Sequence, residues 1–185
     1  MNFTSKREKR LWLWTLFVVL TIYSTLGLAQ KFAGILQNQG LITDGFFFGM
    51  FLIGVAILAF ALKIKLAWIE LGVLLGILGV YTIVSLRTMT PGERSHMIEY
   101  SVVAALIYEA LKERKSQISS LRYPWLLAIL LTTLIGLLDE CLQFFIPNRT
   151  FDLFDVGFNF LSAILAVGAI ASLSWVRNWR LKSSK

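Results

Sequence analysis

Charged and polar side chains interrupt an otherwise apolar stretch in the last third of the chain. Residues 137–160, LLDECLQFFIPNRTFDLFDVGFNF, include Asp139, Glu140, Arg149, Asp152, Asp155 and Asn159. A carboxylate in apolar surroundings can transfer a proton, and several carboxylates together can hold a hard divalent cation. An arginine can bind phosphate or carboxylate groups through its fork of N–H donors. The stretch therefore indicates ligand recognition or acid–base chemistry.

Helical spacing places polar residues on shared faces of three segments. The residues that lie three or four positions apart are His96, Glu99 and Tyr100, then Asp139 and Gln143, and finally Asp155 and Asn159. Such spacings bring side chains to one side of a helix. An ionisable group at the centre of a membrane helix costs about 2.5 to 3.5 kcal/mol on insertion scales, and this cost usually marks function. We therefore expect one shared site.

The composition indicates which elements must position these residues. Of 185 residues, 57% are hydrophobic and 16% are charged, whereas roughly a quarter of the residues in soluble domains are charged. Apolar runs of a length that suits a hydrocarbon core of about 30 Å recur along the chain. We predict an all-α, polytopic membrane protein that forms a single domain over residues 1–185. Its six transmembrane helices are expected at residues 11–29, 45–62, 66–86, 96–111, 125–146 and 156–176.

Basic and aromatic residues predict the orientation of this bundle. Fourteen of the 18 Lys and Arg residues fall on one side: Lys6, Arg7, Lys9, Arg10, Lys63, Lys65, Lys112, Arg114, Lys115, Arg122, Arg177, Arg180, Lys182 and Lys185. All six tryptophans fall at the same ends: Trp12, Trp14, Trp68, Trp125, Trp175 and Trp179. Positive loops stay in the cytoplasm and tryptophan rings anchor at headgroups, so both termini are predicted inside. Basic clusters between apolar runs are topology signals, and we exclude nucleic acid as a partner.

The predicted topology also gives the depth of the polar residues. At a rise of about 1.5 Å per residue, Asp139 lies roughly 21 Å beyond Trp125, in the outer half of the core. Glu99 and Asn159 lie about one helical turn below the outer starts of their own segments. The site is therefore expected to face outward.

Simpler roles exist for several of these residues. Asp152 and Asp155 could cap the last helix, because acidic side chains accept its free N–H groups. Arg149 could reach the membrane interface, and Asp139 with Glu140 could end a helix among headgroups. Elsewhere, Glu70 and Glu109 are expected to pair with Lys63, Lys65 or Lys112. Gly72 and Gly76 form a G-x-x-x-G pattern that predicts close helix packing.

Three motifs resemble the VanZ-like family of membrane proteins. They read HMIEY at 96–100, DECLQ at 139–143 and PNRTFDLFDVGFN at 147–159, and the resemblance covers about residues 96–170. Departures from the family pattern occur at Met97, Asn148, Ser162 and Ala166. The resemblance implies a multi-pass protein of the bacterial cytoplasmic membrane, with relatives that confer teicoplanin-type glycopeptide resistance.

Our first functional hypothesis is recognition without chemistry. An outward-facing polar pocket would bind the headgroup of a membrane lipid, a lipid-linked envelope precursor or a glycopeptide. Arg149 would hold phosphate or carboxylate, while neutral side chains would hydrogen-bond a sugar or peptide. The expected ligand-binding residues are Tyr100, Gln143, Arg149, Asp152, Asp155 and Asn159.

The second hypothesis is a membrane-embedded enzyme that modifies such a precursor. The expected catalytic residues are His96, Glu99, Asp139 and Glu140. His96 would act as general acid or base, and the carboxylates, with Asp155, would tune it or hold a divalent cation of the Mg or Ca type. Zinc is disfavoured because the chain has only one His and one Cys. A transporter ranks third, since we find no inverted repeat and the site lies away from the midplane.

Overall fold

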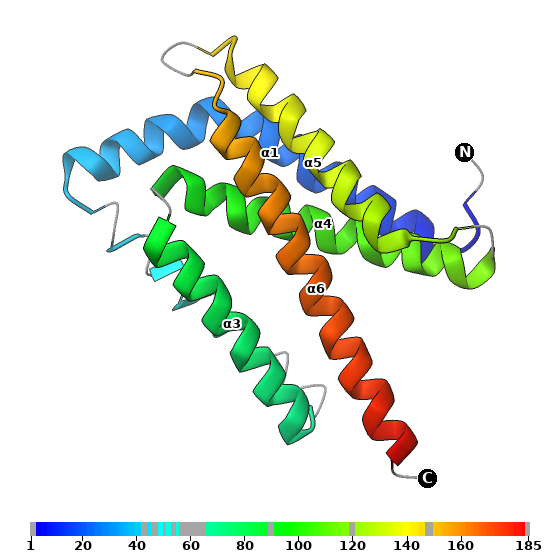
Figure 1. Ribbon diagram of the computed structural model, residues 1–185. Coiled ribbons are helices and arrows are strands. Elements are labelled where there is room, and N and C mark those ends of the chain that lie inside the picture. The colour runs from blue at the N-terminus through cyan, green and yellow to red at the C-terminus, as the bar shows by residue number, and fades with distance from the viewer. Residues whose placement is uncertain are drawn as a thin grey trace. The chain divides into compact units, whose positions relative to one another are not determined.

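The computed structural model is all-helical over the residues that it describes, which are 3–41, 44–45, 48–49, 51–52, 55, 66–88, 91–118, 121–146 and 150–183. These residues form five named helices and no strand: α1 (Lys6–Asn38), α3 (Trp68–Thr88), α4 (Pro91–Gln117), α5 (Pro124–Gln143) and α6 (Leu153–Ser183) (Figure 1). The predicted all-α class is confirmed. Five of the six predicted spans overlap these helices, and most of the span at 45–62 lies outside the described residues.

Local sequence signals explain where these helices begin. Pro124 is the first residue of α5, a position where its missing N–H costs no helical hydrogen bond. At the start of α1, the Glu8 N–H donates to Ser5 Oγ at 3.0 Å, and Glu8 Oε2 accepts from the Thr4 N–H at 2.6 Å. At the start of α6, Asp152 Oδ1 accepts from the Phe154 N–H at 2.7 Å. The capping role predicted for Asp152 is therefore confirmed.

The chain divides into two compact units, which we describe separately. The first comprises residues 1–27 and 93–168. Its apolar core draws residues from four helices: Ile22, Val103, Ala104, Ile107, Leu111, Ala128, Ile129, Ala163, Ala166 and Val167. Several of these side chains are alanines, which let helix backbones approach closely. This core holds α4, α5 and the adjoining parts of α1 and α6 together (Figure 1).

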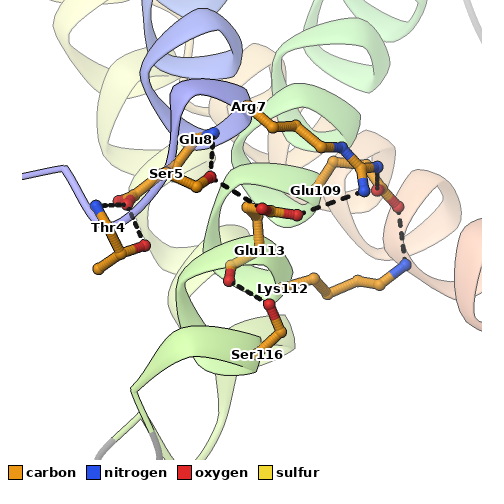
Figure 2. Close-up of polar contacts among 8 residues, drawn as sticks. All are labelled: Thr4, Ser5, Arg7, Glu8, Glu109, Lys112, Glu113 and Ser116. Carbon is orange, nitrogen blue, oxygen red and sulfur yellow. Dashed lines mark hydrogen bonds and ion pairs between the residues drawn. The ribbon is translucent and has the colours of Figure 1, made fainter.

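Ion pairs join the start of α1 to the end of α4 within this first unit (Figure 2). Arg7 donates to Glu109 at 3.1 Å and to Glu113 at 3.3 Å, and Lys112 donates to Glu109 at 2.7 Å. The predicted pairing of Glu109 with Lys112 is confirmed. Glu8, which is fully buried, also accepts from Arg114 at 3.2 Å. Exposed ion pairs contribute little to stability, but this network also includes one buried carboxylate, that of Glu8.

The second unit comprises residues 28–92 and 169–185. Its ion pairs join α3 to the end of α6, where Glu70 lies 3.5 Å from Arg177 Nε and 3.3 Å from Arg180. We had not predicted these two arginines as partners of Glu70; Lys63 and Lys65, which we had predicted, lie outside the described residues. Sequence reasoning missed them because residues far apart in the chain meet here. The close packing predicted at Gly72 and Gly76 is not seen among the described residues.

Two of the described helices, α5 and α6, are long and apolar enough to cross a membrane. Only 33% and 28% of their most apolar stretches are buried, so they do not resemble the enclosed core helices of soluble proteins. Large apolar side chains are also exposed near their ends, including Phe145 at 80% and Phe154 at 77%. Such surface is stable in lipid and costly in water. The six-helix bundle stays a prediction.

Candidate functional site

Three ionisable side chains meet between α4 and α5. His96 Nδ1 lies 3.7 Å from Asp139 Oδ2. His96, Asp139 and Glu140 each offer one ligand atom, and these atoms lie within 4.8 Å of one another. His96 is 4% exposed, and both carboxylates are fully buried. We call these three residues the HDE cluster.

The sequence of α5 explains why adjacent acidic residues both turn inward. The polar or small residues Thr132, Gly136, Asp139, Glu140 and Gln143 recur three or four positions apart and are buried. This spacing makes one helical face. The opposite face carries leucines, among which Leu130, Leu134 and Leu138 are exposed. The helix therefore presents a polar stripe to its protein neighbours and an apolar surface outward.

Backbone and side-chain donors hold the two carboxylates in place. Gln143 Nε2 donates to Asp139 Oδ2 at 3.2 Å and to Glu140 Oε1 at 3.0 Å. The Asp152 N–H donates to Glu140 Oε2 at 3.2 Å. One amide therefore bridges both acids, and the segment that leads into α6 is tied to Glu140. Buried carboxylates need such donors, because removing them from water is otherwise costly.

Two tyrosines border the HDE cluster. Tyr100 is fully buried one turn after His96, and the two rings are stacked with centroids 6.0 Å apart. Asp139 is near enough to interact electrostatically with both Tyr100 and Tyr23. Tyr23, in α1, donates from its hydroxyl to the backbone oxygen of Ile135 at 2.7 Å. Sequence reasoning missed Tyr23, since no spacing within the first predicted span relates it to α5.

Asn159 of α6 enters the same region against Gly136. A Cβ added at Gly136 would stand 2.6 Å from Asn159 Nδ2, so only a glycine fits under this side chain. Asn159 is fully buried, and neither its Nδ2 nor its Oδ1 has a hydrogen-bond partner within the described part of the chain. The hydroxyl of Thr132, one turn before Gly136 on α5, also has no hydrogen-bond partner within the described part of the chain. Thr132 was also missed, although its spacing from Gly136 and Asp139 could have found it.

The other residues predicted for the site have different positions. Glu99 and Asp155 are half-buried and are not members of the HDE cluster. Asp152 is exposed, and its carboxylate caps α6 while its N–H contacts Glu140. Arg149 lies outside the described residues. The structure thus brings six of the predicted residues close together, namely His96, Tyr100, Asp139, Glu140, Gln143 and Asn159.

Two surface grooves in this unit are apolar. The first, of about 400 Å³, is lined by Leu153, Phe154, Gly157, Phe158 and Leu161 at the start of α6. The second, of about 380 Å³, is lined by residues of α1, namely Arg10, Leu13, Trp14 and Phe17. Neither groove is lined by the HDE cluster. The outward-facing polar pocket therefore stays a prediction, and three of its expected residues, Tyr100, Gln143 and Asn159, are buried.

Comparison with known proteins identifies the family of this chain. Neither the curated proteins nor the solved structures gave a match to the chain. The model of the VanZ/LLP1 family matches residues 9–175, which include the HDE cluster and all of its neighbours named above. The match begins far ahead of residue 96, where the recognised motifs begin, and so takes in most of α1 and all of α3 as well. The chain belongs to the VanZ/LLP1 family.

Proposed function

We propose that this protein spans the bacterial cytoplasmic membrane and recognises the headgroup of an envelope lipid, a lipid-linked precursor or a glycopeptide, thereby protecting the cell against teicoplanin-type antibiotics. The observation that carries the proposal is the convergence of polar side chains from α4, α5 and α6 around the HDE cluster. Buried polar groups are costly and are usually retained for function. Membership of the VanZ/LLP1 family supports the envelope setting.

Two features of the site suit a lipid with a polar headgroup. Asn159 offers an amide donor and an amide acceptor, and neither has a protein partner within the described residues. A ligand headgroup would satisfy both. The apolar groove at Leu153 and Phe154 begins next to Asp152, whose N–H contacts Glu140. An acyl chain in this groove would place its headgroup near the cluster.

A membrane-embedded enzyme is the second candidate, and one contact favours it. His96 Nδ1 lies 3.7 Å from Asp139 Oδ2, an arrangement in which a carboxylate can orient an imidazole for proton transfer. Gln143, which donates to Asp139 Oδ2, would then hold Asp139 in position. The substrate would be the same class of lipid-linked precursor, and the carboxylates would tune His96 or hold a divalent cation.

Drug protection by two variants separates these functions. Wild type, His96→Gln and Arg149→Lys would be produced at matched membrane abundance in a teicoplanin-susceptible bacterium. Proton transfer by His96 predicts a loss of about 10²- to 10⁴-fold in turnover for His96→Gln, and hence loss of protection. Headgroup recognition predicts partial protection by His96→Gln, because an amide still hydrogen-bonds, but weak protection by Arg149→Lys, because a lysine lacks the bidentate fork.

Glu109→Gln provides the matched control, because Glu109 lies in the ion-pair network of Figure 2 and not in the HDE cluster. This variant should protect like wild type. Normal protection by both His96→Gln and Arg149→Lys would show that neither residue is needed for protection. Failure of the wild type to protect would contradict the proposed resistance role.

A further inference from the structure

We propose that the HDE cluster binds a first-row divalent transition-metal ion, of the Mn²⁺ or Zn²⁺ type, through His96, Asp139 and Glu140. The inference concerns the region discussed for headgroup recognition, but metal binding can be measured with no lipid, glycopeptide or phenotype. It therefore stands or fails separately from the proposed function.

The geometry of the cluster is close to that of a metal site. Ligand atoms about 2.1 Å from an ion, at tetrahedral or octahedral angles, lie roughly 3.0 to 3.4 Å from one another. His96 Nδ1 and Asp139 Oδ2 are 3.7 Å apart, and all three candidate ligand atoms lie within 4.8 Å. Small side-chain rotations would close these distances around an ion. The ligands come from one turn of α4 and one turn of α5.

Asn159 supplies a second and independent indication of a ligand. Its side chain is fully buried, and neither polar atom of its amide has a partner within the described residues. Its contact with Gly136 places this amide against the turn of α5 that precedes Asp139 and Glu140. A buried amide with two unused hydrogen-bonding atoms is rare in proteins. A metal-bound water between Asn159 and the cluster would satisfy it.

The charge of the HDE cluster and the hydrogen bonds that its carboxylates accept also suit a bound cation. Asp139 and Glu140 bring two negative charges when ionised, and a divalent ion beside a neutral His96 balances both. Gln143 donates to an oxygen of each carboxylate, and the Asp152 N–H donates to the second oxygen of Glu140. Metal-ligating carboxylates are commonly held by hydrogen-bond donors of this kind.

The ligand types select the class of ion. One imidazole nitrogen with two carboxylate oxygens suits manganese, iron or zinc, whereas Mg²⁺ and Ca²⁺ prefer oxygen ligands alone. This set differs from the Mg or Ca type that the sequence suggested, because the nitrogen of His96 joins two carboxylates, and Glu99 and Asp155 are not members of the cluster. It also reverses our expectation against zinc, which counted only His and Cys as ligands, because carboxylate oxygens bind zinc as well. Cys141 is exposed and is not a member of the cluster, so no thiolate enters the set.

The test is metal binding by the full-length protein, purified in detergent and stripped with a chelator. Mn²⁺ and Zn²⁺ would be titrated separately, with bound metal measured by mass spectrometry and Mn²⁺ also by paramagnetic resonance. We expect one ion per chain, a higher melting temperature with the metal, and no displacement by a large excess of Mg²⁺. Absence of stoichiometric binding by the wild type, for both ions, would overturn the proposal.

Variants then locate the ion. Asp139→Asn and Glu140→Gln should each weaken binding by at least about tenfold and abolish the metal-dependent rise in melting temperature. Glu113→Gln serves as the control, because it removes an acidic group that lies on α4, like His96, but belongs to the ion-pair network. It should bind metal like wild type. Equal losses in all three variants would mean non-specific binding and would reject the site.

Arg149 offers the main competing account, since a guanidinium could also neutralise the two carboxylates. In that case Arg149→Gln would lower the melting temperature of the metal-free protein, and the wild type would show no binding. A metal site predicts instead that Arg149→Gln still binds one ion. If Asp139→Asn loses the ion but keeps drug protection, the metal site stands and the proposed role of the cluster in protection fails.

Discussion

Asn159 of α6 occupies the space that a side chain at Gly136 of α5 would need, with its amide nitrogen 2.6 Å from the position of a Cβ. This contact sets how closely the two helices approach beside the HDE cluster. It also explains a glycine in the middle of α5, where glycine costs about 1 kcal/mol relative to alanine.

Gly136→Ala should therefore destabilise the protein, although alanine is the better helix former. The added methyl group must displace Asn159 within a packed interface, which typically costs about 1 to 3 kcal/mol. Gly168→Ala is the matched control, because it lies in α6 and nothing stands within 4 Å of an added Cβ. Thermal unfolding in detergent should show a lower melting temperature for Gly136→Ala only. Equal stability of the two variants would contradict the contact.

Tyr23→Phe tests the link between α1 and α5. The hydroxyl of Tyr23 donates to the backbone oxygen of Ile135 at 2.7 Å, and losing this hydrogen bond should cost about 1 kcal/mol. Tyr123→Phe removes a hydroxyl from an exposed residue and should have little effect. Chemical denaturation of both variants measures the difference. Unchanged stability of Tyr23→Phe would mean that this hydrogen bond does not hold α1 in place.

The sequence predicted helices and helical faces well, because both depend on local spacing. The relation between Asp139 and Gln143 follows from positions four apart, and the structure joins them by a hydrogen bond. The close contact of Asn159 with Gly136 could not be predicted, since it depends on how α6 approaches α5. The pairing of Glu70 with Arg177 and Arg180 was not predicted, because these residues lie far apart in the chain.

Residues at helix ends show a second limit of prediction from the sequence. The sequence favoured a site residue or a cap at Asp152, and the structure uses its carboxylate as a cap and its N–H as a donor to Glu140. Residue types alone cannot separate two roles that one residue fills with different atoms. Ser5 and Glu8 have the spacing of a capping box, which we had not predicted; the Glu8 N–H donates to Ser5 Oγ, while the Glu8 carboxylate accepts from the Thr4 N–H.

Glu8 should make stability depend on acid pH. Burial raises the pKa of its carboxyl, but hydrogen bonds from Thr4 and the charge of Arg114 outweigh burial, so the pKa lies below its ordinary value. A carboxyl with a lowered pKa stabilises the fold above its unfolded pKa, and this stability is lost as the pH falls through the folded pKa. Glu8→Gln should therefore lose less stability than wild type on acidification below about pH 5.

Arg114→Gln provides the matched test of cause. Without the guanidinium, the pKa of Glu8 should rise toward its ordinary value, so that the acid loss of stability becomes smaller than in wild type and is complete at a higher pH. Melting temperatures measured across acid pH would compare the three proteins. Identical pH profiles for wild type and Glu8→Gln would show that Glu8 does not contribute to the acid dependence.

Orientation in the membrane is the last prediction, and it decides which side reaches the HDE cluster. Single cysteines at Asn38, Ser119 and Asn148, in a background where Cys141 is replaced by Ser, would be treated with an impermeant thiol reagent on intact cells. Basic residues and tryptophans predict that Asn38→Cys and Asn148→Cys react and that Ser119→Cys reacts only after lysis. Replacing Cys141 is necessary because it is exposed. Labelling of Ser119→Cys in sealed cells would reverse the topology, and the cluster would then be nearer the cytoplasmic face.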